Sequence, residues 1–261
     1  MGKLLEHKYG DQFHILNNAW ANHLLALFSS DKTQVPNLFL QVDQLYQYML
    51  QYVLNNMLEK KQLELKTRMY DSTDKAVLNV EGLDLSRELS ILSLARAGII
   101  PSQRLFESLL NLYPVSQLRM DHVYINRKTN EQNEVVGVEF TGSKIGGSFQ
   151  NKTCLIPDPM GATGSTIDFV VNNLLKENSK ELPKRVIAMH LIITPEYIKL
   201  IKEKCPQLQV VALRVDRGLT EDKYLSDLPG TFLEEEKGLN QFHYIVPGAG
   251  GVGELFNNSF C

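Results

Sequence analysis

The segment LIPDPMGATGST, from Leu155 to Thr166, combines an acidic side chain, two glycines and several hydroxyl groups. Asp158 follows a predicted strand, and Gly161 and Gly164 turn the chain toward a predicted helix. Glycines let backbone N–H groups approach a ligand closely, and a helix N-terminus offers free N–H groups with a partial positive charge. These features predict a phosphate-binding loop. The loop contains no lysine, which excludes a Walker-type P-loop.

Asp158 is the acidic group of this loop. A carboxylate here can accept hydrogen bonds from ribose hydroxyls, and its charge would stabilise positive charge that develops on the sugar in a transition state. The alternative, that Asp158 only forms the turn at the end of the strand, stays open.

Two arginines follow strand-like runs upstream of the loop. Arg96 follows Leu89 to Ala95, and Arg127 follows His122 to Ile125. A guanidinium group can bind a phosphate through paired hydrogen bonds, which makes both arginines candidates for phosphate recognition. A solvated or salt-bridged side chain is the alternative for each.

Residues 238–256 read GLNQFHYIVPGAGGVGELF and are dense in glycine. Backbone N–H and C=O groups exposed in this way can read a flat heterocyclic base, and a loop without any ligand is the alternative. His122, His190 and His243 lie among apolar neighbours, and we do not expect them to act as general bases.

These blocks resemble, in the same order, those of the uracil phosphoribosyltransferase family, which belongs to the type I group that binds phosphoribosyl pyrophosphate (PRPP). DPMGATGS is similar to the family loop DPMLATGGS, and the tail is similar to GLNxxGYIxPGLGDAGDRxFGT. The resemblance implies catalytic roles for Asp158, Arg96 and Arg127. It implies that PRPP contacts Arg96, Arg127, Asp158, Pro159, Met160, Gly161, Ala162, Thr163, Gly164, Ser165 and Thr166. It implies that uracil contacts Tyr244, Ile245, Gly250, Gly251 and Val252.

The chain departs from the family pattern at three places. Gly161 replaces a leucine, so we expect a looser loop there, and Arg127 lies further from Tyr124 than is usual. Gly251 replaces an aspartate that is expected to help hold PRPP, and Glu254 does not obviously replace it. Loss of such a group would remove about 2–4 kcal/mol of transition-state stabilisation.

The resemblance implies a transferase that converts uracil and PRPP to UMP and pyrophosphate. Mg²⁺ would accompany PRPP, since hard cations bind pyrophosphate oxygens, and no metal-ligating side chain is assigned. A homodimer or larger homo-oligomer is expected. Two alternatives stay open: a PRPP- or nucleotide-sensing regulatory protein with weak or no catalysis, and a transferase for a different base.

The predicted elements that position these residues alternate along the chain. The runs 153–156, 185–193 and 209–215 are predicted strands, and 165–176 and 195–204 are predicted helices. Such alternation predicts an α/β fold with a central, mostly parallel sheet, flanking helices and ligands at the carboxyl ends of the strands. The runs 122–125 and 135–140 predict a β-hairpin arm, and the tail predicts a C-terminal hood.

The N-terminal part has a different rhythm. Residues 11–67 are predicted to be helical, with a break between Asp31 and Pro36. Apolar residues recur there at three- and four-residue steps, a pattern typical of a helix that faces a core or a dimer contact. These residues are Leu45, Tyr48, Met49, Tyr52, Val53 and Met57. We expect a helical region over 1–75, packed on a phosphoribosyltransferase domain over 76–261.

Composition bounds the function further. The chain has 261 residues, 43% hydrophobic and 22% charged, with a net charge of −3. The absence of a basic excess argues against nucleic-acid binding. No apolar run reaches the roughly 20 residues that a membrane span needs. The three cysteines show neither zinc spacing nor a disulfide framework, so a cytoplasmic location is expected.

Overall fold

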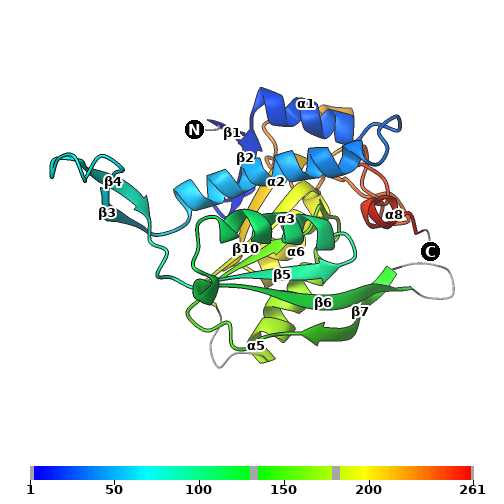
Figure 1. Cartoon of the computed structure of the whole chain (residues 1–261). Coiled ribbons are helices and arrows are strands. Elements are labelled where there is room, and N and C mark those ends of the chain that lie inside the picture. The colour runs from blue at the N-terminus through cyan, green and yellow to red at the C-terminus, as the bar shows by residue number, and fades with distance from the viewer. Residues whose placement is uncertain (1–2, 130–134, 178–182, 260–261) are drawn as a thin grey trace.

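The computed structural model describes residues 3–129, 135–177 and 183–259, and the side chains of residues 127–136 lie outside this description. A nine-stranded sheet forms the centre of the molecule, in the order β1-β2-β11-β10-β8-β5-β6-β7, with β9 paired to β10 (Figure 1). Its strands are β1 (Lys3–Leu4), β2 (Phe13–Asn17), β5 (Leu89–Ala95), β6 (Leu118–Thr129), β7 (Val135–Lys144), β8 (Thr153–Pro157), β9 (Met160–Gly161), β10 (Arg185–Ile193) and β11 (Gln209–Val215).

The sheet is mostly parallel, as expected. Pairing is parallel from β2 through β11, β10, β8 and β5 to β6, while β1 with β2 and β6 with β7 pair antiparallel. β8 and β10 are almost entirely buried. Their continuous runs of apolar residues are typical of strands covered on both faces. The β6–β7 hairpin confirms the predicted arm.

Helices cover both faces of the sheet. One apolar core joins the sheet to α1 (Ala19–Phe28), α2 (Asn37–Asn56) and α3 (Ile99–Leu110). The other core lies against α4 (Ser165–Phe169), a π-helical segment (Val170–Leu174), α5 (Leu175–Glu177) and α6 (Pro195–Lys204). A 3-10 turn (Val115–Gln117), α7 (Asp222–Leu225) and α8 (Val252–Asn257) complete the helices of the described residues. The strands that lead into the phosphate loop are therefore packed against helices on both faces of the sheet.

The prediction of a helix over 11–67 is wrong at both ends. Residues 13–17 form β2, which joins the central sheet beside β11. A short apolar run such as Phe-His-Ile-Leu does not distinguish strand from helix by periodicity alone. Residues 60–66 form β3 (Lys60–Lys66), where Leu63 and Leu65 alternate with polar residues at period two. The break between Asp31 and Pro36 is confirmed, and the division at residue 75 stays a prediction.

The apolar stripe of α2 belongs to the core of the chain itself. Leu45, Met49 and Val53 are fully buried, and Tyr48 and Tyr52 pack against the same cluster. The stripe therefore gives no support for a dimer contact.

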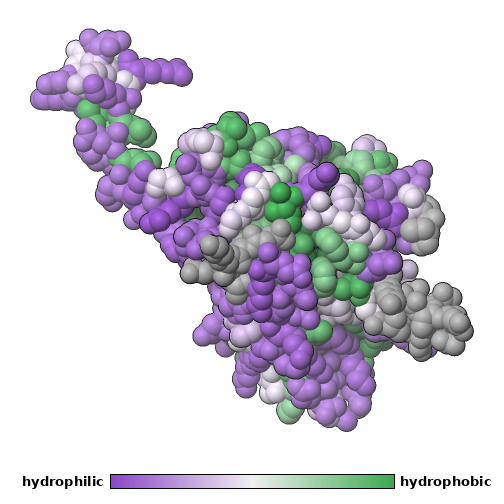
Figure 2. Space-filling model, turned by 90° about the horizontal axis from the view of Figure 1, so that it is seen from below, coloured by the Kyte–Doolittle hydropathy of each residue, from purple (hydrophilic) through white to green (hydrophobic). Residues whose placement is uncertain are grey.

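A two-stranded arm extends from the body between α2 and β5. β3 pairs antiparallel with β4 (Val77–Leu83), and the pair stands clear of the remainder of the molecule (Figures 1 and 2). Leu63 lies opposite Val80, and Leu65 lies opposite Leu78. Because alternate strand residues share a face, these four side chains form one apolar face of the arm.

No helix in the described ranges is long and apolar enough to pass through a bilayer. Cys154 and Cys205 are buried free thiols, and Cys261 lies outside the described residues.

Candidate functional site

The predicted phosphate loop joins β8 to α4. After Pro157 the chain passes Asp158, makes the short strand β9 against Ile192 and Ile193 of β10, and turns at Gly164. Gly164 has φ 85°, a left-handed conformation that glycine adopts without steric cost. The Thr163 hydroxyl lies 3.0 Å from the Ser165 hydroxyl and accepts a hydrogen bond from the Ser165 backbone N–H at 3.3 Å. The predicted order of strand, glycine turn and helix is confirmed.

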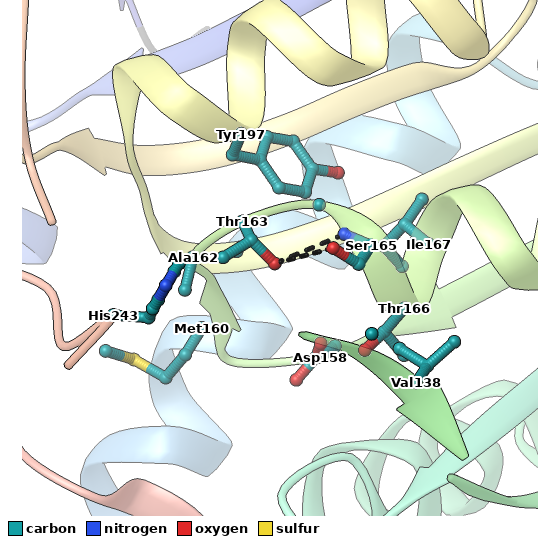
Figure 3. Close-up of a pocket in the computed structure, with 13 residues that line it drawn as sticks. Val138, Asp158, Met160, Ala162, Thr163, Ser165, Thr166, Ile167, Tyr197 and His243 are labelled. Carbon is teal, nitrogen blue, oxygen red and sulfur yellow. Dashed lines mark hydrogen bonds between the residues drawn. The ribbon is translucent and has the colours of Figure 1, made fainter. Parts of the chain in front are cut away.

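A pocket opens on this loop (Figure 3). Its lining comes from the hairpin strand β7, the loop with the start of α4, helix α6 and the C-terminal tail. The lining residues are Gly137, Val138, Asp158, Met160, Gly161, Ala162, Thr163, Gly164, Ser165, Thr166, Ile167, Tyr197 and His243. The hairpin, the loop and the tail, which are far apart in sequence, therefore meet around Asp158.

Side chains from β10 and the start of α6 hold the backbone of the loop through hydrogen bonds. The His190 Nδ1 donates to the carbonyl oxygen of Asp158 at 2.6 Å, and the Tyr197 hydroxyl donates to the His190 Nε2 at 2.8 Å. The Thr194 hydroxyl donates to the carbonyl oxygen of Ala162 at 2.6 Å. All three side chains are fully buried. The loop backbone is thus fixed at both ends before any ligand binds.

Burial lowers the pKa of His190 to about 4, although its bond to the Asp158 carbonyl acts in the opposite direction. An unfolded histidine titrates near 6.5, so the unfolded chain binds more protons between these two values. We expect the contribution of His190 to the free energy of unfolding to be complete above pH 6.5. It should fall by about 3 kcal/mol as pH drops toward 4.

Urea unfolding of the wild type and of His190→Asn across this pH range measures that contribution. The variant should be less stable at pH 7 and should lose less stability on acidification. Parallel pH slopes for the two proteins would show that His190 does not titrate in this way.

The turn Arg96-Ala97-Gly98 lies against the start of the loop. A Cβ added to Gly98 would come within 2.7 Å of the carbonyl oxygen of Pro157. Ala97 faces Gly253 of α8, so the turn also contacts the tail. Arg96 is exposed, and its guanidinium donates to the backbone oxygen of Ser259 at 3.1 Å. Arg96 is not part of the pocket lining, but its turn borders the end of β8, the strand that leads to Asp158.

Arg127 lies on β6, directly across the hairpin from Val138. Val138 lines the pocket. The side chain of Arg127 lies outside the described residues, so its phosphate-binding role stays a prediction.

Two acidic side chains, the buried Asp216 and the half-buried Glu196, hold the tail in place. Asp216, at the end of β11, is paired with Arg214 and accepts from the Gly248 backbone N–H at 2.7 Å. Glu196 accepts from the backbone N–H of Gly238 and Leu239 at 3.0–3.2 Å. These hydrogen bonds hold the tail in a defined conformation, which is consistent with the predicted hood.

A sequence model of the family described as uracil phosphoribosyltransferase matches residues 15–232, most of the chain. The chain belongs to this family. The uracil phosphoribosyltransferase of Lactococcus lactis subsp. cremoris is 24% identical over 93% of this chain and 96% of its own length. That of Lactobacillus gasseri is 23% identical over 82% and 92%.

Other relatives match over a shorter stretch. The uracil phosphoribosyltransferase of Thermococcus sibiricus is 30% identical over 59% of this chain, and the match spans 51% of its own length. The match to the enzyme of Dictyostelium discoideum spans 43% of that protein. Among solved structures, a protein from Aquifex aeolicus superposes with a TM-score of 0.69 at 20% identity, covering 93% of this chain and 96% of its own. This last similarity concerns the fold.

The glycine that replaces the family's leucine at position 161 does not loosen the loop, contrary to expectation. Gly161 is buried and pairs with Ile193 in the sheet. A Cβ at this position would lie 2.8 Å from a methyl carbon of Ile193 and 3.0 Å from the ring of Tyr197. Tyr197 occupies the space beside residue 161, so the glycine is required by close packing.

The residues predicted to contact uracil lie in the tail but do not line the pocket. Ile245 pairs with Leu239, Tyr244 is 45% exposed and Val252 is buried at the start of α8. At Gly251 an added Cβ would lie 2.4 Å from a carboxylate oxygen of Glu254. The side chain of Glu254 therefore bends back over the position from which the family aspartate is absent.

Sequence reasoning missed three contributors to the pocket. Tyr197 lies on a helix that the motifs do not include, and Val138 belongs to a hairpin identified only as an arm. His243 lies among apolar neighbours in the sequence, and that pattern does not place it at the loop. Its position within the quoted tail motif, next to Tyr244, was the available signal.

Proposed function

We propose that the chain transfers a phosphoribosyl group from PRPP to uracil, which gives UMP and pyrophosphate. The observation that supports this most is the pocket on the Asp158–Thr166 loop, walled by the hairpin and by the tail. Family membership supports the reaction type.

In this proposal the loop from Ala162 to Thr166 binds the 5′-phosphate through backbone N–H groups and hydroxyls. A bond forms between a ring nitrogen of uracil and the anomeric carbon, while the carbon–oxygen bond to pyrophosphate breaks and the nitrogen loses its proton. Asp158 stabilises positive charge on the ribose as this happens. Holding both reactants in one orientation supplies much of the rate. Pro159 and Met160 shape the loop beside the sugar.

Arg96 and Arg127 bind the leaving pyrophosphate in this proposal. Arg96 is exposed and its turn borders the loop, so its guanidinium can exchange the Ser259 carbonyl for a phosphate oxygen. Such an exchange replaces a neutral acceptor with a charged one, which makes a stronger hydrogen bond.

Mg²⁺ is proposed to enter with PRPP. Within the described residues no group of three or more histidine, cysteine or acidic side chains is arranged to hold a metal ion. A Mg²⁺ ion on pyrophosphate needs only one or two protein carboxylates, and Asp158 is the acidic side chain that lines the pocket. The ion would neutralise charge on the leaving group.

The test is an assay with labelled uracil, PRPP and Mg²⁺, together with calorimetric titration of UMP. Formation of UMP supports the proposal. Binding of UMP without turnover would favour a sensing protein, and turnover with another base would favour a transferase of different specificity. Tyr244, Ile245, Gly250, Gly251 and Val252 are the proposed uracil contacts, so substitutions there should change KM for uracil more than KM for PRPP.

We further propose a cytoplasmic homodimer that uses the β3–β4 arm. Leu65 and Leu78 on its apolar face are 51% and 52% exposed, and Val80 is 41% exposed. Two isolated strands are marginally stable in water, so a partner surface that covers this face would stabilise the arm.

Light scattering after size exclusion should give twice the 29.6 kDa chain mass. The variant Leu65→Lys/Leu78→Lys should shift the protein to the monomer mass, because charges on both strands oppose burial of the face. Glu64→Lys, on the opposite face of β3, is the matched control and should leave the mass unchanged. A dimer that survives the double substitution would argue against the arm as the contact.

A further inference from the structure

His243 carries two unfavourable features beside the pocket. Its φ of 59° lies in the left-handed region, which only a few per cent of non-glycine residues adopt, although histidine is found there more often than most. Its ring atom Nδ1 is buried and has no hydrogen-bond partner within the described part of the chain. Strained backbone and unsatisfied buried polar atoms concentrate at functional sites.

The turn itself imposes this conformation. The side-chain oxygen of Asn240 accepts from the backbone N–H groups of Phe242 and Tyr244 at 2.9 and 3.0 Å, and the backbone N–H of His243 donates to the Asn240 carbonyl at 2.9 Å. Glycine would fit this position without strain. The family pattern quoted above also has glycine there, so the turn alone does not call for an imidazole.

Among the described lining residues, His243 is the one that carries an imidazole ring. Figure 3 shows the ring on one side of the pocket beside Ala162 and Met160, with Asp158 and Thr166 further across. The described lining contains no lysine or arginine. The imidazole ring of His243 carries an N–H group, which can donate a hydrogen bond to a phosphate oxygen.

We propose that His243 binds the 5′-phosphate of the ligand together with the loop. This inference rests on the proposed function, since it assumes that the loop takes a phosphorylated ribose. It adds a side-chain contact from the tail to a cradle otherwise made of backbone groups and hydroxyls. The tail would then contact the sugar phosphate as well as the base.

The experiment is calorimetric titration of the full chain with ribose 5-phosphate, UMP and uridine. His243→Gly and His243→Asn both suit a left-handed backbone, so the fold should survive, with a melting temperature within about 2 °C of the wild type. Both variants should bind ribose 5-phosphate and UMP about tenfold more weakly, the loss expected when a hydrogen bond to a charged group is removed. Uridine affinity should not change. His23→Asn, on the exposed surface of α1, is the matched control and should bind all three as the wild type does.

Three results would overturn the inference, and only the last of them would also contradict the proposed function. If the wild type binds ribose 5-phosphate and the His243 variants bind it equally well, the inference fails while the proposed function stands. A loss confined to uridine would assign His243 to the base and would overturn it likewise. If the wild type binds neither ribose 5-phosphate nor UMP, the proposed function and the inference fall together.

Discussion

Asp158→Asn is expected to lower kcat for UMP formation by about 10²–10³-fold. Asparagine keeps the size of the side chain but removes the negative charge next to the ribose. Loss of one preorganised electrostatic group in an active site typically has this effect. The backbone of Asp158 is held by His190 and by Met189, whose carbonyl accepts from the Asp158 N–H at 3.0 Å, so the substitution should not move the loop.

The same variant should retain affinity for ribose 5-phosphate, because the proposed phosphate contacts come from residues 162–166 and not from the carboxylate. A large loss in kcat with a small change in ribose 5-phosphate affinity separates charge stabilisation from ground-state binding. Asp227→Asn, an exposed acid away from the pocket lining, is the control. Activity of Asp158→Asn within about threefold of the wild type would reduce Asp158 to a turn-forming residue.

The double variant Gly251→Asp/Glu254→Gln is expected to raise kcat/KM for PRPP by about 10²-fold or more. Restoring a carboxylate at position 251 should return about 2–4 kcal/mol of transition-state stabilisation. Gly251 has φ −78°, which any residue can adopt. The obstacle is Glu254, whose carboxylate oxygen lies 2.4 Å from the position of the new Cβ.

Glu254 has a flexible side chain and can move, but a carboxylate at position 251 would lie close to that of Glu254, and the two like charges would repel each other. Gly251→Asp alone should therefore gain less than the double variant. Gly251→Asn/Glu254→Gln has the same shape without the charge and should gain little. Steady-state kinetics of these variants test the idea, and a double variant no faster than the wild type would mean that the missing aspartate does not limit turnover.

Most of the fold could be predicted from the sequence because its central strands have distinct patterns. β8, β10 and β11 read as apolar runs that alternate with helices, and the glycine turn after Pro157 marks the loop. β2 and β3 could not be predicted so easily. β2 is five residues long and becomes a strand because β11 offers it a parallel partner, which is a tertiary cause that no local pattern contains.

The part of the site that a single sequence motif forms could be predicted. The part formed by segments that are distant in sequence could not. The motif around Asp158 identifies the loop, but Val138, Tyr197 and His243 reach it from separate elements. The tight packing of Gly161 also depends on Tyr197, 36 residues further along the chain. A glycine in place of a larger residue suggests a loosely packed motif. Whether the space beside it is empty depends on a neighbouring side chain, here that of Tyr197.

The position of β2 has a practical consequence for anyone who shortens this protein. β2 covers the outer edge of β11, and α1 and α2 supply much of one core. A fragment starting at residue 76 would lack β2, so the main-chain donors and acceptors on the outer edge of β11 would have no partners, a template for edge-to-edge aggregation. The beginning of the polypeptide is thus a structural part of the sheet that carries the phosphate loop.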